Sequence, residues 1–306
     1  MELNSYIENY IDSCTHVKKL SPDTVKAYRI DLNQYASFIG GTLEDSKVLV
    51  QYIKSLNEKY APRTAKRKLA SVHALYKDML IAEVIEHNPF DRIAARIHTP
   101  SQLPRTIPLN VINAVLSCAY SAYSHEERYA LRDIVILELL FGTGMRVSEL
   151  CSLTKESFVV ENETVRITIN GKGRKQRIIQ LTNSEIVKVV IEYYATIDSE
   201  KTEPAPIFIN QWGNRITPQT VRGIITRYAS RCKLDIHITP HMFRHTFATA
   251  LLDEGVDIRY IQSFLGHSSI STTQIYTHVS VEKQAVILAE KHPRNRMTID
   301  RSAAPD

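Results

Sequence analysis

The stretch FGTGMRVSEL, residues 141–150, places a glycine-rich turn between two helical segments. The apolar run before it has helical spacing, and Gly142-Thr143-Gly144 is typical of a helix stop. Arg146 lies at the start of the next helix, where backbone N–H groups and a guanidinium together favour a bound phosphate. Glu149 follows one turn later and could brace Arg146. Taken alone, a surface arginine–glutamate pair beside a tight turn is the commoner explanation.

A basic stretch, GKGRKQR, occupies residues 171–177. The β-rich runs Val165–Ile169 and Arg177–Leu181 flank it, so the sequence predicts an antiparallel hairpin with a basic tip. Lys172 at this tip could bind a phosphate or donate a proton to a departing alkoxide. Arg174 and Lys175 are candidate DNA-binding residues of the same tip. An ordinary solubilising hairpin tip fits the stretch equally well.

The stretch HMFRHTFATALLDEG, residues 241–255, follows a helix-start signal, Thr239-Pro240. His241 and Arg244 are three residues apart, so one helix face offers an imidazole and a guanidinium to a single anion. His245 raises the alternative of a zinc site. The zinc motif HExxH requires glutamate at its second position, where this chain has Met242, so no metal is expected.

The stretch GHSSISTTQIYTH, residues 266–278, contains His267 and Tyr276. A helix is predicted to stop at Gly266, and a second helix that starts within 268–272 would carry Tyr276. A tyrosine hydroxyl titrates near ~10 and is a poor nucleophile at neutral pH. It attacks a phosphate only where cations stabilise the developing charges. The candidate cations are Arg146, Lys172, His241, Arg244 and His267.

The first hundred residues have helical periodicity throughout, and Ser21-Pro22 and Pro62 mark two helix starts. Four cations fall in the first turns of the helix that opens at Pro62: Arg63, Lys66, Arg67 and Lys68. Positive charge at a helix N-terminus opposes the macrodipole, so these side chains are candidate contacts to a DNA backbone. A solvated charged face is the commoner explanation. The net charge of +5 is compatible with a polyanionic partner but does not demonstrate one.

The chain of 306 residues is long enough for two domains, and a proline-rich break predicts a boundary between Ile97 and Pro108. No apolar run reaches the ~18 residues of a membrane span, and the acidic N-terminus is unlike a secretory signal. We therefore expect a cytoplasmic protein. The four cysteines are scattered and favour free thiols over disulfides or a zinc knuckle.

The four stretches, in this order and spacing, together with KHPRNR at 291–296, resemble the tyrosine recombinase (phage integrase) family, and most closely its Xer-type branch. The resemblance covers the whole chain. It implies a mainly α fold with two domains, which form a C-shaped DNA clamp. These are a helical SAM-like core-binding domain (1–97) and, after a linker (98–107), a mixed α/β catalytic domain (108–296) with a small antiparallel sheet. The tail, 297–306, is predicted to be disordered.

The resemblance also implies roles for the candidate residues. Arg146 and Arg244 would hold the scissile phosphate, and Glu149 would support Arg146. His241 and His267 would assist the same phosphate, and Lys172 would protonate the leaving 5′-hydroxyl. Tyr276 would attack and form a 3′-phosphotyrosyl link, so that neither metal nor ATP is required.

The implied partner is a double-stranded DNA recombination site. Four protomers would assemble on two such sites, as a homo-tetramer or as a heterotetramer with a paralogous recombinase. The helix at 281–290 would pack on a neighbouring protomer. Chromosome-dimer resolution and mobile-element movement remain open. A DNA-binding regulator with a degenerate site is the alternative from another class, whereas a metal-dependent nuclease would require clustered carboxylates, which the sequence lacks.

Overall fold

The computed structural model describes residues 3–40, 46–93, 105–124, 127, 129–161, 164–171, 176–181, 183–197 and 205–266. The chain forms two compact units, 1–102 and 103–306, each with a hydrophobic core of its own. Most of the predicted linker, the predicted tail and the predicted helix at 281–290 lie outside the described residues.

The first unit is helical. Its elements are α1 (Leu3–His16), α2 (Pro22–Phe38), α3 (Ser46–Lys59), α4 (Pro62–Ile81) and the short 3-10 helix η1 (Pro89–Arg92). Helix α2 begins as the sequence predicts, because the Ser21 side chain accepts a hydrogen bond from the Thr24 amide and Pro22 occupies the first turn. The apolar faces of the helices meet in one core, where the hydroxyls of Tyr35 and Tyr76 are joined at 2.7 Å.

A buried ion cluster joins α2 to α4. Asp31 is fully buried, and its carboxylate accepts hydrogen bonds from Arg67, from Lys68 at 2.9 Å and from Ser71 at 3.0 Å. Lys68 also donates to Gln34, and its side chain is only 4% exposed. A buried charge is tolerated when a counter-charge and hydrogen bonds satisfy it. Two of the four cations in the first turns of α4 therefore neutralise a carboxylate of the same unit.

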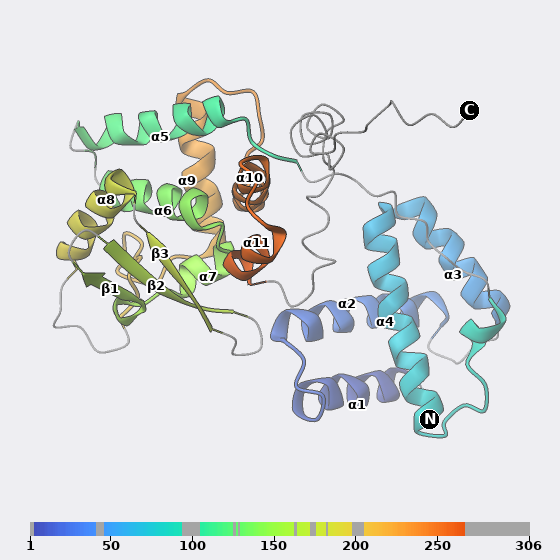
Figure 1. Ribbon diagram of the computed structural model, residues 1–306. Helices are drawn as coiled ribbons and strands as arrows, with labels where there is room; N and C mark the ends of the chain where they lie inside the picture. Colours follow the sequence, from blue (N-terminus) through green and yellow to red (C-terminus); the bar gives the residue numbers. More distant parts are fainter. Residues whose placement is uncertain are drawn as a thin grey trace, which may run out of the picture. The chain divides into compact units, whose positions relative to one another are not determined.

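The second unit combines helices with a small sheet (Figure 1). Its helices are α5 (Leu109–Ser124), α6 (Ala130–Thr143), α7 (Val147–Ser152), η2 (Lys155–Ser157), α8 (Ser184–Ala195), α9 (Pro218–Arg231), α10 (Pro240–Asp253) and α11 (Ile258–Leu265). Helix α6 is buried on nearly every side and contacts α5, α7, α8, α9 and α10. A helix that is buried on nearly every side belongs in the interior, so α6 forms the central support of this unit.

The sheet has the order β1-β2-β3 and is antiparallel. Its strands are β1 (Phe158–Glu161), β2 (Thr164–Asn170) and β3 (Gln176–Leu181). The predicted hairpin corresponds to β2 and β3, with Asn170 opposite Gln176 at its described end. One face, with Ile167 and Ile179, packs into the core. The sequence did not predict β1, since only Phe158 of its four residues is buried.

The fold class agrees with the sequence-based expectation of a mainly α chain with a small antiparallel sheet. Helix α10 begins at the predicted start, where the Thr239 side chain caps the Met242 amide and Pro240 occupies the first turn. Within the described part of the chain, no helix is both long and apolar enough to cross a membrane.

Removing the Asp31 carboxylate should destabilise the first unit strongly. Asp31→Ala leaves the Lys68 ammonium buried without its counter-charge, which typically costs about 3–5 kcal/mol. Urea unfolding followed by circular dichroism reports both units, whereas the fluorescence of Trp212, the single tryptophan, reports only the second. We expect the circular dichroism curve to gain an early transition that tryptophan fluorescence does not show.

The matched control is Glu8→Ala, which removes the carboxylate of an exposed pair with Arg29 at 2.7 Å. Exposed pairs contribute about 0–1 kcal/mol, so this variant should unfold almost like the parent chain. Equal losses in the two variants would contradict the structural role assigned to Asp31.

Candidate active site

The turn between α6 and α7 allows close packing of several segments. Gly144 has φ +59° and ends α6 in the left-handed region. A Cβ at this position would overlap the ring of Phe247 in α10 and lie 3.1 Å from Leu265 in α11. Because Gly144 has no side chain, α10 and α11 can pack closely against the turn that precedes Arg146.

Arg146 and Glu149 form the predicted pair, and the contact is more extensive than a surface ion pair. The Arg146 amide donates to Glu149 Oε2 at 2.7 Å, and Arg146 Nη1 donates to Glu149 Oε1 at 2.9 Å. The Glu149 side chain is 5% exposed and that of Arg146 is 40% exposed. Within the described residues, the other guanidinium donors of Arg146 have no protein acceptor. They are therefore available to an anion at the surface.

A second arginine, Arg177 of β3, binds the same carboxylate. Its Nη1 lies 3.1 Å from Glu149 Oε1 and its Nη2 lies 2.8 Å from Glu149 Oε2. Burial alone would raise the pKa of Glu149, but the hydrogen bonds and charges of Arg177 and Arg146 outweigh it and lower the pKa below its ordinary value. Glu149 is consequently a fixed anion between two arginines.

Arg244 of α10 is buried, at 2% exposure, and holds the turn to α11. Its Nη1 donates to the Gly144 carbonyl at 2.8 Å and its Nη2 donates to the Leu265 carbonyl at 2.7 Å. A guanidinium is a planar fork of N–H donors, so these two bonds fix its plane. The predicted phosphate ligand is thus also a structural link between α6, α10 and α11.

His241 lies at the first turn of α10 and is exposed to solvent on one side. Its partial burial, followed by the positive charges of Arg244 and Arg146, lowers its pKa below the ordinary value of 6.5. Arg244 lies three residues from His241 on the same helix, and the imidazole, with its lowered pKa, is mostly neutral at pH 7. The ring of His245 packs edge-on against it, with 4.1 Å between centroids. A neutral imidazole can accept a proton.

The structure thus brings together Arg146, Glu149, His241 and Arg244, from segments about a hundred residues apart. The other predicted site residues lie outside the described residues: Lys172, Arg174, Lys175, His267 and Tyr276. Two described residues that lie close to them in the sequence contact the cluster. Arg177 of β3 binds Glu149, and the Leu265 carbonyl binds Arg244. No group of three or more potential metal ligands occurs among the described residues.

The cations of α4 fall into two kinds. Arg63 and Lys66 are exposed and remain candidate DNA contacts. Arg67 is half-exposed and already bound to Asp31. The prediction for Lys68 is corrected, because its side chain is buried and its ammonium is held by Asp31 and Gln34. Lys68 is a core ion-pair partner of the first unit rather than a surface contact.

Arg177 is the site residue that the sequence interpretation missed, because it was taken as the edge of a basic hairpin tip. A signal was present in the strand itself. Arg177, Ile179 and Leu181 alternate along β3, so they share one face, and the other two are buried core residues. An arginine on the buried face of a strand requires an acceptor inside the protein.

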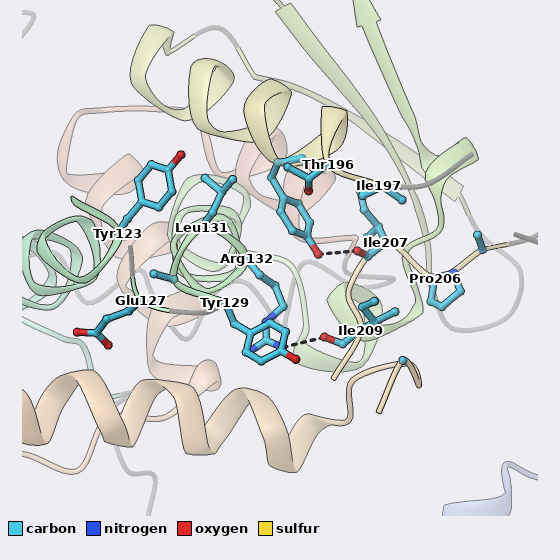
Figure 2. A pocket seen from close by; sticks show the side chains of 14 residues that line it. Tyr123, Glu127, Tyr129, Leu131, Arg132, Thr196, Ile197, Pro206, Ile207 and Ile209 are labelled. Carbon is cyan, nitrogen blue, oxygen red and sulfur yellow. Dashed lines mark hydrogen bonds between the residues drawn. The ribbon is translucent and has the colours of Figure 1, made fainter. Parts of the chain in front are cut away.

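A separate cavity of about 540 Å³ lies at the other end of α6 (Figure 2). Tyr123, Tyr129, Leu131 and Arg132 contribute to its lining, and Arg132 reaches across to the Ile209 carbonyl at 2.8 Å. The fourteen residues of α6 span about 20 Å, so this cavity is not part of the cationic cluster at the opposite helix end.

Comparison with known proteins agrees with this geometry. Residues 111–283 match the model of the phage integrase family, and residues 7–83 match its N-terminal SAM-like domain. A tyrosine recombinase of Agathobacter rectalis is 45% identical over 302 residues, which cover 95% of this chain and 97% of the relative. Tyrosine recombinase XerC of Bacillus subtilis is 32% identical, with 95% of this chain and 97% of the relative covered.

Solved structures agree in fold. The XerH site-specific recombinase bound to a palindromic difH substrate, in a post-cleavage complex, superposes with a TM-score of 0.72. The two sequences are 21% identical, and the match covers 91% of this chain and 82% of the other. Both family models and the relatives over nearly the full length lead to one assignment: the chain belongs to the phage integrase family and is a site-specific tyrosine recombinase, an enzyme that breaks and rejoins DNA.

Proposed function

We propose that the cationic cluster around Arg146 is the cleavage site and that Tyr276 is its nucleophile. The Tyr276 oxygen attacks the scissile phosphorus while the 5′-oxygen leaves. This exchanges one phosphodiester bond for a 3′-phosphotyrosyl bond. His241 accepts the phenol proton, and Lys172 supplies a proton to the departing 5′-oxygen. Reversal of these steps with a different 5′-hydroxyl rejoins the strands, so no external energy source is consumed.

The observation that best supports this proposal is the convergence of Arg146, His241 and Arg244 at the α6–α7 turn. Two fixed guanidinium groups and a neutral imidazole suit a phosphodiester whose negative charge increases in the transition state. A buried carboxylate holds Arg146, and backbone carbonyls hold Arg244. Neither guanidinium therefore has to move when charge develops on the phosphate. His267 follows Gly266 directly in the chain and would add a further donor.

A non-catalytic DNA-binding regulator would not need this arrangement. Phosphate contacts for binding alone are usually made by exposed, mobile lysines and arginines. Arg244 is instead 2% exposed, and Arg146 is fixed through Glu149. The family membership likewise favours the enzyme.

The substrate in this proposal is a double-stranded DNA recombination site, as in the complex of XerH with difH. Arg63 and Lys66 of the first unit and Arg174 and Lys175 of the second would contact its phosphates. Four protomers, identical or paired with a paralogous recombinase, would exchange strands between two sites. The two units would then act on the same duplex as a clamp.

Replacing the proposed nucleophile should abolish covalent capture of DNA. When the protein cleaves a nicked duplex that carries the target site, a short fragment with the 5′-hydroxyl diffuses away. Rejoining is then impossible, and the protein stays covalently bound to the DNA. In EDTA, we expect the parent chain to form an adduct that survives denaturation and Tyr276→Phe to form none. Mass spectrometry of the adduct should place the nucleotide on Tyr276. An adduct on another residue, or a requirement for a divalent metal, would refute the mechanism.

The pH dependence of cleavage should report the neutral state of His241. At subsaturating DNA, the rate reflects groups of the free protein. Because the pKa of His241 is lowered from 6.5, the rate should fall on the acid side with a midpoint below pH 6.5. His241→Gln should be slow and lack this acid limb. An acid limb with a midpoint above 6.5 in the parent chain would contradict this role.

Exposed cations of α4 should contribute to the salt dependence of DNA binding. Each phosphate contact contributes about 0.9 to the slope of log K against log salt concentration. Lys66→Ala and Arg63→Ala should each lower the slope by about that amount. Lys188→Ala, at an exposed position on α8, should leave it unchanged. Equal changes in all three variants would indicate a general charge effect rather than contacts by α4.

A further inference from the structure

We infer that Arg177 is a positioning residue for DNA cleavage, an inference that rests on the proposed function of the Arg146 site. Arg177 orients Arg146 through the carboxylate of Glu149 and fixes the end of α11, after which His267 follows in the chain. Its side chain is 11% exposed, and its guanidinium donates three hydrogen bonds, two to the Glu149 carboxylate and one to the Phe264 carbonyl. It acts through these neighbours rather than on the DNA.

The first step of the argument is the number of bonds at Glu149. Each carboxylate oxygen accepts one bond from Arg146 and one from Arg177, at distances from 2.7 to 3.1 Å. A carboxylate offers about four lone-pair sites, so both arginines together saturate it. Removal of Arg177 would leave two of these sites empty in a place where solvent has little access. The carboxylate could then rotate, and Arg146 would rotate with it.

The second step is the end of α11. Arg177 Nε donates to the Phe264 carbonyl at 2.7 Å, and Arg244 donates to the adjacent Leu265 carbonyl at 2.7 Å. The last carbonyls of a helix have no partner within the helix and attract cations. Gly266, with φ +64°, packs directly on Arg177, since a Cβ there would lie 3.1 Å from its Nη1. Two arginines from β3 and α10 therefore hold the carboxyl end of α11.

The geometry also requires a guanidinium in particular. One fork of Arg177 binds both carboxylate oxygens while its Nε points to a carbonyl on a different helix. A lysine could keep the charge, but its single ammonium cannot span both acceptors in this way. A glutamine could keep some hydrogen bonding but would lose the charge that lowers the pKa of Glu149. The two substitutions separate the contributions of charge and shape.

The test compares Arg177→Lys and Arg177→Gln with the parent chain in the full-length protein. Cleavage of the nicked duplex at saturating protein measures the chemical step, and titration of intact duplex measures affinity. We expect Arg177→Gln to slow cleavage on the order of 100-fold, as misplacement of a catalytic group does, with little change in affinity. Arg177→Lys should recover part of the rate.

The pH profile supplies a readout that a purely structural role would not change. Loss of Arg177 removes hydrogen bonds and charge that lower the pKa of Glu149. Protonation of Glu149 should therefore begin at higher pH in Arg177→Gln. In a His241→Gln background, which lacks the acid limb of His241, adding Arg177→Gln should make the cleavage rate fall at higher pH than in His241→Gln alone. Arg177→Lys should show a smaller displacement.

The chain offers a closely matched control, Arg132→Gln. Arg132 is 8% exposed, binds Asp133 through Nε and Nη2 at 3.0 and 2.8 Å, and donates to the Ile209 carbonyl. Like Arg177, it makes two bonds to a carboxylate and one to a backbone carbonyl, but at the far end of α6. Below the unfolding temperature of all variants, Arg132→Gln should cleave at nearly the parent rate. Equal slowing in both variants would overturn the inference.

Hydrogen exchange tests the role of Arg177 independently of the proposed function, because it does not require DNA cleavage. In Arg177→Gln, peptides covering 145–150 and 258–266 should exchange faster, whereas those of α9 should not change. If the parent chain formed no Tyr276 adduct, the proposed function would fail and the exchange data would still show whether Arg177 holds Glu149 and α11. Unchanged exchange in both peptides, or normal cleavage by Arg177→Gln, would overturn the role of Arg177.

Discussion

The carboxylate of Glu149, buried between Arg146 and Arg177, is the interaction on which the site depends. A buried carboxylate is costly unless hydrogen-bond donors and counter-charges surround it, and here the two guanidinium groups supply three bonds and the Arg146 backbone amide supplies a fourth. The need to satisfy one anion therefore draws β3 against α7. Because Arg177 also binds the Phe264 carbonyl, α11 is held at the same place. One guanidinium, that of Arg146, remains at the surface with open donors.

Helix α6 and the turn after it make this convergence possible. The helix is buried on nearly all sides, so its carboxyl end is held firmly by the helices around it. Gly144 then removes the side chain that would separate the turn from Phe247 and Leu265. Arg244 closes the gap with hydrogen bonds to the Gly144 and Leu265 carbonyls. Packing and polar bonds thus fix the same few atoms, which suits a site that must meet a phosphate without rearranging.

The sequence predicted those features of the fold that depend on residues close together in the chain, such as helix starts and the hairpin. The Ser21 cap, the Thr239-Pro240 helix start and the β2–β3 hairpin were all evident, as were the residues now gathered around Arg146. Long-range partners were not evident. The charge run of α4 gave no sign that Lys68 is buried, because its partner Asp31 lies 37 residues away on another helix. Arg177 was missed for the same reason, since its acceptors lie 28 and 87 residues away.

The central claim is that Arg146, fixed by Glu149, neutralises charge on the scissile phosphate. A nicked duplex with one neutral methylphosphonate at the cleavage position tests this most directly. If charge neutralisation is the role of Arg146, then Arg146→Ala should cleave ordinary DNA far more slowly than the parent chain does. On the methylphosphonate, it should come close to the parent rate, because the charge is already absent. An equally large loss on both substrates would contradict the account.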